Sequence, residues 1–298
     1  MRKVLLATTA LVAMSVTGAQ AADISIGGNL ETNFVNTGAG DSFKLDGNVV
    51  LSATQATDAG VTYEVVWSQR IEQRQVDVAD GGAAEKLVNL DTVQQASLAI
   101  SSADLGTLYL GNADDDAVGM MDGAAGSNQD IEGNDWYQGG DFEKAPWMTP
   151  LDNGGTGATW ISPNISGFQV GASSFPGKDN SSFAAKFSAG GIEVMYGNKN
   201  DDSLMAVKGS VAGFTVATAV RKVDGSKSKA NDFAVKYAFP NGITVAGLVA
   251  KGSKADGTEL KYNNVGASYS LAPGITLKVE AGEANNAGFT FIGVNSSF

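Results

Sequence analysis

The stretch Phe233-Ala234-Val235-Lys236-Tyr237-Ala238-Phe239 alternates large apolar side chains with small or charged ones. Successive side chains of a β-strand point to opposite faces, so this spacing gives a strand with one apolar and one polar face. An α-helix would need apolar residues three and four apart, and the 38 glycines of the chain disfavour long helices. The stretch therefore predicts a β-strand that lies between two different environments.

The same period of two recurs along most of the chain, in short stretches separated by turn residues. The connections alternate between short turns, such as Ala272-Pro273-Gly274, and longer polar loops, such as the one from Arg221 to Asn231. An even number of strands, with short turns at one end and longer loops at the other, is typical of an outer-membrane β-barrel. We count sixteen such stretches, which start near residues 23, 42, 60, 88, 105, 156, 166, 181, 191, 202, 213, 231, 242, 258, 274 and 286.

A soluble β-sandwich is the alternative fold, because its strands also alternate. In a sandwich the polar parity would be ordinary surface and would carry many charges, whereas here it is rich in Ser, Thr, Asn and Gly. The chain also ends on Phe298, which shares its parity with Ile292 and Val294. The fold class that we predict is all-β: a transmembrane antiparallel β-barrel of sixteen strands, with a long constriction loop folded into the lumen.

The first residues have the pattern of an export signal. Arg2 and Lys3 precede the apolar stretch from Val4 to Val16, and Ala19-Gln20-Ala21 supplies small residues for cleavage. The apolar stretch is shorter than the about 20 residues that a transmembrane helix needs. We therefore predict a cleaved signal peptide over residues 1–21 and a single β-barrel domain over residues 22–298.

Composition excludes several functions. The chain contains no histidine and no cysteine, so it lacks the commonest general base, the commonest metal ligand and any disulfide. No nucleophile stands beside a base in any recognisable pattern, so we do not expect an enzyme and no cofactor is implied. The net charge of −12 argues against nucleic acid as a partner.

The longest irregular stretch runs from about residue 112 to residue 155, well beyond ordinary loop lengths. It is strongly acidic, and Lys144 is its only cation. A ring of carboxylates in a narrow, water-filled lumen would raise the local cation concentration and repel anions. We expect this loop to constrict a pore that prefers cations weakly. Its candidate constriction residues are Asp114, Asp115, Asp116, Asp122, Asp130 and Glu132.

Arg70, Glu72 and Arg74 share one parity of the third stretch and are the candidate pore wall opposite this loop. A lipid-facing arginine at mid-membrane would cost about 2–4 kcal/mol, which favours the lumen for this parity. Two alternatives for the acidic loop stay open. Its carboxylates could be ordinary solvated surface, or Asp114 and Asp116 could bind calcium.

Not every outward residue fits the barrel pattern. Glu259 and Lys261 share their parity with Val265 and Tyr269, which we assign to lipid. They lie near the loop end of their strand, where lipid headgroups and water can reach them, although a register error would also explain them. The outward aromatic residues that could form interfacial girdles are Trp67, Phe168, Phe214 and Tyr237.

Four segments resemble, in order, parts of the general porins of Gram-negative bacteria, in particular the alphaproteobacterial type. These are Leu105-Gly106-Thr107-Leu108-Tyr109-Leu110-Gly111-Asn112, the segment from Trp160 to Gly171, Tyr237-Ala238-Phe239-Pro240-Asn241-Gly242, and Gly266-Ala267-Ser268-Tyr269-Ser270-Leu271. The resemblance, in the same order, spans nearly the whole chain after the leader.

The resemblance implies a sixteen-stranded homotrimeric channel in the outer membrane, through which small hydrophilic solutes and ions diffuse passively. By position, it implies that Asp114, Asp115, Asp116 and Asp122 lie nearest the narrowest point, and that Phe298 is the signal read by the barrel-assembly machinery. The chain departs from many members in having few arginines. A substrate-specific channel, or a non-conducting structural or adhesive barrel, is the alternative function.

Overall fold

A computed structural model describes residues 22–37, 40–76, 85–89, 93–113, 116–129, 131, 155–176, 180–200, 202–223, 228–253 and 256–298. In these residues, seventeen β-strands and two short 3₁₀ helices occur. The elements are β1 (Asp23–Thr37), β2 (Gly40–Ala56), β3 (Val61–Val76), β4 (Glu85–Asn89), β5 (Val93–Ser102), β6 (Gly106–Ala113), η1 (Gly119–Met121), η2 (Gly126–Gln129), β7 (Gly155–Ile161), β8 (Phe168–Phe175), β9 (Asn180–Ala189), β10 (Ile192–Lys199), β11 (Asp202–Val211), β12 (Phe214–Val223), β13 (Ser228–Ala238), β14 (Ile243–Ser253), β15 (Glu259–Ala272), β16 (Ile275–Ala284) and β17 (Ala287–Ser297).

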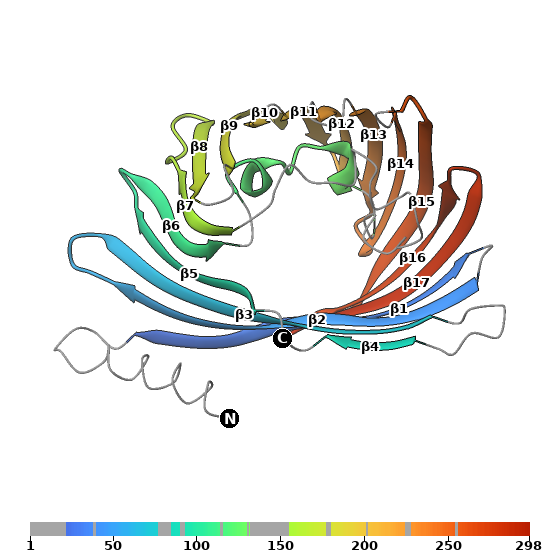
Figure 1. Ribbon diagram of the computed structural model, residues 1–298, viewed down its shortest axis with the longest axis horizontal. Helices are drawn as coiled ribbons and strands as arrows, with labels where there is room; N and C mark the ends of the chain where they lie inside the picture. The colour runs from blue at the N-terminus through green and yellow to red at the C-terminus, as the bar shows by residue number, and fades with distance from the viewer. Residues whose placement is uncertain are drawn as a thin grey trace.

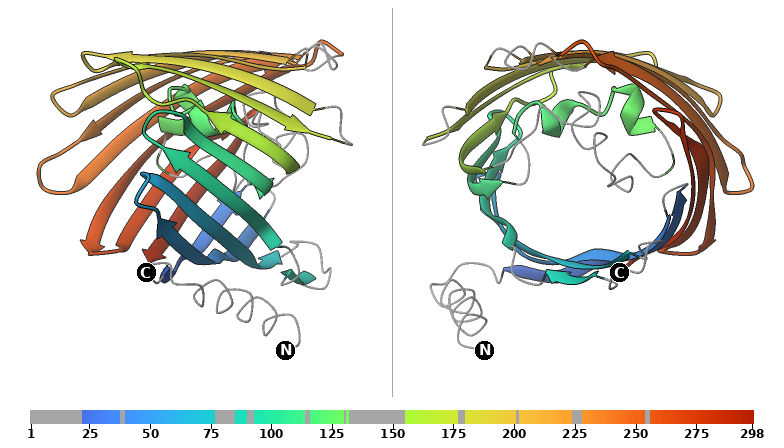
Figure 2. Two further views of the ribbon diagram at one scale, coloured as in Figure 1. Left: turned by 90° about the vertical axis from the view of Figure 1, so that its left-hand side faces the viewer. Right: turned by 45° about the vertical axis from the view of Figure 1, so that its right-hand side comes forward.

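The strands form one antiparallel sheet that closes on itself (Figures 1 and 2). Closure comes from the pairing of β1 with β17, which runs from Asn29↔Ser297 to Thr37↔Phe289. The last residue completes it, because the backbone N–H groups of Gly28 and Phe298 each donate to the other residue's carbonyl at 3.1 Å. A closed barrel leaves no unpaired sheet edge, which is the requirement for strands surrounded by hydrocarbon.

The predicted number of barrel strands is confirmed. Strand β3 pairs with β4 over its residues 72–76 and with β5 over its residues 61–69, so β4 and β5 are two parts of one barrel strand. Counted in this way, the barrel has sixteen strands. The interruption between β4 and β5 was not predicted by the alternation.

The two ends of the barrel carry different connections. At the turn end, which includes the β9–β10 connection, Gly190 and Gly191 form a two-residue turn with φ values of 58° and 82°. Such turns favour glycine because their central residues need positive φ. The connections at the loop end, which include the one between β6 and β7, are less uniform in length than predicted. There, Asn285-Asn286 joins β16 to β17 in two residues, with φ values of 48° and 69°.

The two faces of the sheet differ as the sequence predicts. Large apolar side chains point outward and stay exposed in the isolated barrel, including Phe233 at 46% and Val265 at 58%. Their neighbours Asp232 and Ala234 point inward and are buried. A continuous apolar outer surface of this kind requires contact with lipid hydrocarbon. None of the helices in the described part of the chain is long and apolar enough to cross a membrane.

Aromatic side chains gather on the outer surface at the turn end. The ring of Tyr237 lies 4.2 Å from that of Phe214 and 4.5 Å from that of Phe239, measured between centroids. Phe168 begins β8 at the same end, whereas Trp67 lies farther along its strand. Phe168, Phe214, Tyr237 and Phe239 thus lie at the turn end, which is where an interfacial girdle of aromatic residues is expected.

The assignment of the two faces predicts an asymmetric response to one substitution. Val265→Lys places a charge on the outer face of β15 and should lower the free energy of unfolding by about 2–4 kcal/mol. Val50→Lys is the matched control, because Val50 shares the inward parity of β2 with Asp46 and Ser52. Urea unfolding of the protein in lipid vesicles measures the free energy of unfolding of both variants. Equal destabilisation by the two variants would contradict the assignment.

Candidate functional site

The most distinctive feature of the barrel is a piece of chain that lies inside it. Residues 116–129 and 131, which we call the inner segment, lie in the chain between β6 and β7 and contain η1 and η2. Figures 1 and 2 show the two helices within the ring of strands, close to one side of the wall. The segment reaches as far as β15, because a methyl group added at Gly266 would lie 3.0 Å from the Cγ1 atom of Ile131.

An apolar contact holds the inner segment to the wall. Small side chains in the wall permit the close approach: a methyl group at Gly197 would lie only 2.7 Å from the Cγ1 atom of Val118. The contact removes apolar side chains of the segment from water, which stabilises this position in an otherwise polar lumen. Its buried members are Ala117, Val118, Met121, Ala124 and Ala125 of the segment, and Ala184, Met195, Leu204, Ala206 and Ala219 of β9–β12.

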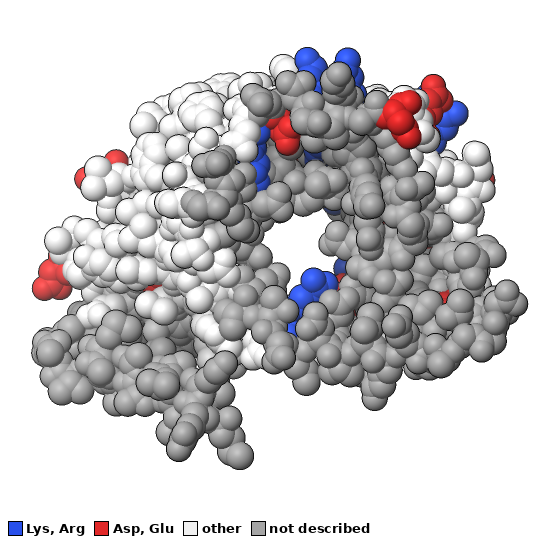
Figure 3. Space-filling view, viewed as in Figure 1, with Lys and Arg blue, Asp and Glu red and all other residues white. Residues whose placement is uncertain are grey.

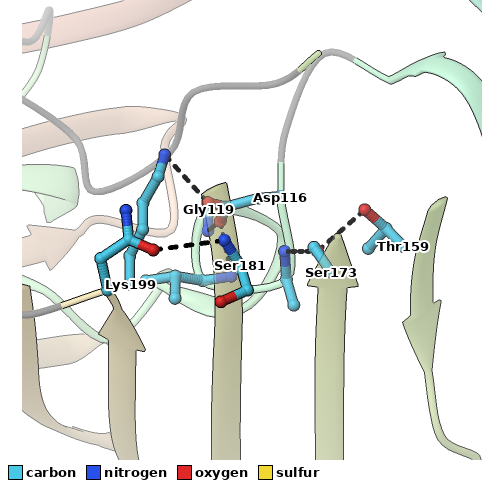
Figure 4. Close-up of polar contacts among 9 residues, drawn as sticks. Asp116, Gly119, Thr159, Ser173, Ser181 and Lys199 are labelled. Atoms are coloured by element: carbon cyan, nitrogen blue, oxygen red, sulfur yellow. Dashed lines mark hydrogen bonds and ion pairs between the residues drawn. The ribbon is translucent and has the colours of Figure 1, made fainter. Parts of the chain in front are cut away.

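Asp116 anchors the start of the inner segment (Figure 4). Its Oδ1 accepts the N–H groups of Val118 at 2.8 Å and Gly119 at 3.1 Å. Its Oδ2 lies 3.2 Å from Nζ of Lys199 on β10, and the two side chains are 0% and 6% exposed. Beside it, the N–H of Ala117 donates to Oγ of Ser173 at 2.7 Å.

The position of Asp116 corrects one expectation. The family resemblance implied that its carboxylate lies nearest the narrowest point, but the structure buries it completely against the wall. Side chains alternate between two faces only in a strand, so odd or even position in the sequence carries no information about the direction of a loop side chain. Asp116 therefore contributes to anchoring, and its charge is balanced by Lys199.

Asp232 on β13 is a second anchor, and the sequence analysis missed it. Its Oδ1 accepts the N–H groups of Gly126 at 2.9 Å and Ala219 at 2.7 Å. Its Oδ2 accepts Nη1 of Arg221 at 2.9 Å, and the two side chains are 0% and 3% exposed. The alternation around Phe233 does predict that Asp232 points inward. It could not predict Gly126, which is 106 residues away in the chain.

A third contact lies between these anchors. The ammonium group of Lys208 on β11 donates to the carbonyl of Gly123 at 2.8 Å and lies 3.3 Å from Oε1 of Glu193 on β10. The inner segment is thus held at three places by polar contacts, first to β8 and β10, then to β11 and then to β13, in addition to its apolar face.

Strands β16, β17 and β1–β3 lie across the lumen from the inner segment (Figure 1). Two of the cations described on this part of the wall pair with carboxylates. Arg70 forms two hydrogen bonds with Asp46, from Nε at 3.1 Å and from Nη2 at 2.6 Å. Lys278 donates to Glu31 at 2.9 Å. Figure 3 shows an open passage through the molecule with basic side chains at its margin. Glu72 and Arg74 lie on β3, but their side chains are outside the described part of the structure.

A cavity of about 650 Å³ lies at the turn end of the inner segment, between it and the wall. Its lining includes Met120 of the segment, Tyr109, Gln169 and Lys186 of the strands, and no acidic residue. Within the described residues, Lys186 has no ion pair. Its ammonium group is therefore a cation of the lumen wall that no described carboxylate neutralises.

The other predicted site residues fall into two groups. Asp122 follows η1 and is partly exposed. Asp114, Asp115, Asp130 and Glu132 lie outside the described residues. Of the two carboxylates in the calcium hypothesis, that of Asp116 is engaged by Lys199 and two N–H groups. The part of the chain that the structure describes contains no group of three His, Cys, Asp or Glu side chains that could hold a metal ion.

A closed barrel with an apolar exterior, an open passage and a segment folded inside it defines a membrane channel. The sequence profile of the Gram-negative porins matches residues 7–288, so the chain belongs to this family. Its fold is similar to that of a mutant of the Rh. blastica porin, with a TM-score of 0.66, 18% identity, and coverage of 93% of this chain and 100% of that one. The molecule is thus an outer-membrane channel for passive diffusion and not an enzyme.

Two further solved structures show the same fold. One is OmpF of Salmonella typhi in complex with daunomycin, with a TM-score of 0.69, 12% identity, and coverage of 93% of this chain and 98% of that one. The other is an anion-selective porin from Comamonas acidovorans, with a TM-score of 0.68, 10% identity, and coverage of 93% and 100%. No curated protein sequence matches the chain.

The buried Asp232 anchor predicts two separable effects. Asp232→Ala should lower the free energy of unfolding by about 3–5 kcal/mol, because the buried guanidinium of Arg221 loses the carboxylate that lies 2.9 Å from its Nη1. It should also make the open-channel current noisier, because the segment loses its contact at Gly126. The double variant Asp232→Ala, Arg221→Met should recover stability without restoring a quiet current. Urea unfolding and single-channel recording test this, and a current as quiet as that of the unsubstituted protein in both variants would contradict the anchoring role.

Proposed function

We propose that the inner segment is the constriction of this porin and that the pore prefers cations weakly. The observation that supports this most strongly is the attachment of the segment: an apolar face and three polar contacts hold it inside the lumen, on one side. A segment held in this way narrows the passage for every solute that diffuses through it.

The charge balance of the wall supports the cation preference. Among the described residues, five lumen-facing cations are within ion-pair distance of a carboxylate, and these pairs contribute little net field along the pore. Apart from Asp116, which pairs with Lys199, the acidic residues of the stretch from residue 112 to residue 155 far outnumber its single cation, Lys144, and would supply a negative field that Lys186 opposes. Low-dielectric walls focus such a field in a narrow lumen. The five pairs are Arg70–Asp46, Lys199–Asp116, Lys208–Glu193, Arg221–Asp232 and Lys278–Glu31.

We also propose that the protein is a homotrimer, that residues 1–21 are a cleaved signal peptide, and that Phe298 is the assembly signal. Membership of the porin family supports all three. The side chain of Phe298 is 70% exposed at the turn end of the barrel, where a binding partner can reach it.

Selectivity is tested by substitutions that remove the same charge from opposite faces. In a salt gradient across a planar bilayer, the reversal potential should show a weak preference for cations. Lys186→Gln should raise the cation-to-anion permeability ratio about two- to fivefold, because a unit charge near a permeating ion contributes roughly 0.5–1 kcal/mol in a watery lumen. Lys229→Gln, on the outer face, should leave it unchanged. A clear anion preference of the unsubstituted protein would refute the proposal.

The trimer is tested by its resistance to detergent. The folded protein should migrate as an oligomer in dodecyl sulfate at room temperature and as a monomer after boiling, because a β-barrel resists this detergent until heated. Cross-linking before electrophoresis identifies the number of subunits. A monomer under both conditions, without cross-linked products, would contradict the trimer.

A further inference from the structure

Four lysines lie on the outer face of the barrel at the loop end of β12–β15. They are Lys222, Lys229, Lys251 and Lys261, and each is exposed. Their direction follows from the alternation of each strand: Arg221, Ala230, Ala250 and Tyr262, next to them in the chain, are buried on the inner side. We call these four residues the outer lysine strip.

The strand register brings the lysines into two like-charged pairs. Lys222 of β12 stands directly opposite Lys229 of β13, and Lys251 of β14 directly opposite Lys261 of β15. Asn231 joins the pairs, because it is the next outward residue of β13 after Lys229 and stands opposite Lys251. Like charges directly opposite one another in a sheet are unfavourable. Two such pairs side by side, in a protein of net charge −12, require a counter-charge.

The protein itself supplies little of that counter-charge. In the described residues, Lys222, Lys229 and Lys251 form no ion pair. Lys261 lies 3.7 Å from Glu259, but both side chains are more than half exposed, and such pairs contribute little. The only other carboxylate described on the outward faces of β12–β16 is Glu283 of β16, opposite Asn263. Figure 3 shows basic side chains at the upper outer rim of the barrel, with acidic side chains beside those at its right.

Below the strip, toward the middle of the barrel, most outward residues of the same strands are apolar, with Asn263 of β15 a polar exception. Val220 precedes Lys222 by two residues on β12, Val249 precedes Lys251 by two on β14, and Val265 follows Lys261 on β15. These three valines are 52%, 51% and 58% exposed. The surface therefore changes from hydrocarbon-compatible to basic over the last positions of four adjacent strands. Lysines next to such a surface lie at the depth of lipid headgroups.

We propose that the outer lysine strip binds the phosphate groups of an anionic lipid in the leaflet at the loop end, with the acyl chains of that lipid on the apolar surface of β12–β15. The two lysine pairs offer positions for more than one phosphate. A lipid that carries two phosphates should therefore bind better than a lipid that carries one. This role also explains why Lys261 breaks the apolar alternation of β15, whereas Glu259 is left as its weak, exposed ion-pair partner.

Lipid retention by the folded protein tests the proposal. The protein is purified in a neutral detergent and incubated with diphosphoryl lipid A, monophosphoryl lipid A or phosphatidylcholine, and native mass spectrometry measures the bound lipid. Diphosphoryl lipid A should bind best and phosphatidylcholine least. The quadruple variant Lys222→Gln, Lys229→Gln, Lys251→Gln, Lys261→Gln should lose about tenfold or more in affinity for the diphosphoryl lipid, because each lysine near an anionic surface adds severalfold.

Matched variants separate the effect of the lost charge from the effect of a disturbed structure. The quadruple Lys→Arg variant at the same positions should retain the lipid, and Lys186→Gln, which removes a lysine from the lumen, should not affect it. Unchanged single-channel conductance confirms that the glutamine variant is folded. Equal retention by the glutamine variant and the unsubstituted protein, or equal binding of phosphatidylcholine, would overturn the proposal. So would displacement of the lipid by millimolar inorganic phosphate, which would identify the ligand as a free anion.

Discussion

Every backbone N–H and C=O group that enters a lipid hydrocarbon must find its partner within the protein, because no water is available there. In this chain the pairing of β1 with β17, extended by Phe298 on Gly28, satisfies that requirement at the one place where a sheet would otherwise have edges. Closure then creates two environments. Residues of one parity meet lipid, residues of the other line the lumen, and each strand must suit both at once.

The inner segment depends on the same closure, since only a closed wall can surround it. A loop in a water-filled lumen has no reason to stay at one position unless the wall binds it. Here the wall offers alanines and glycines, which allow close approach, and buried charges on β10 and β13, each of which needs a partner. Lys199 forms an ion pair with Asp116 of the segment. Asp232 pairs with Arg221 through Oδ2, and its Oδ1 accepts the N–H group of Gly126 from the segment. Apolar contact and charge therefore act on the same few turns of chain.

Alternation was sufficient to predict the barrel, its sixteen strands and the outward direction of Val265, because each of these depends on neighbours within one strand. It could not predict the two-residue connection at Asn285-Asn286, where asparagine adopts a positive φ that is more usual for glycine. Alternation says nothing about Asp116, because a loop residue has no fixed face, and the position implied by the family resemblance did not reveal that its side chain is buried. The contact of Asp232 with Gly126 could not be predicted for a different reason. The two residues are 106 positions apart in the chain, and only the folded barrel brings them together.

The central claim is that the two parities of a strand meet different solvents, and the chain is well suited to a direct test because it contains no cysteine. Single cysteines placed in turn at residues 263–269 of β15 can carry a fluorophore in protein reconstituted in lipid vesicles. We predict that a quencher attached to lipid tails acts on the odd-numbered positions and that aqueous iodide acts on the even-numbered ones. Quenching by iodide at every position, with no effect of the lipid-bound quencher, would contradict the account.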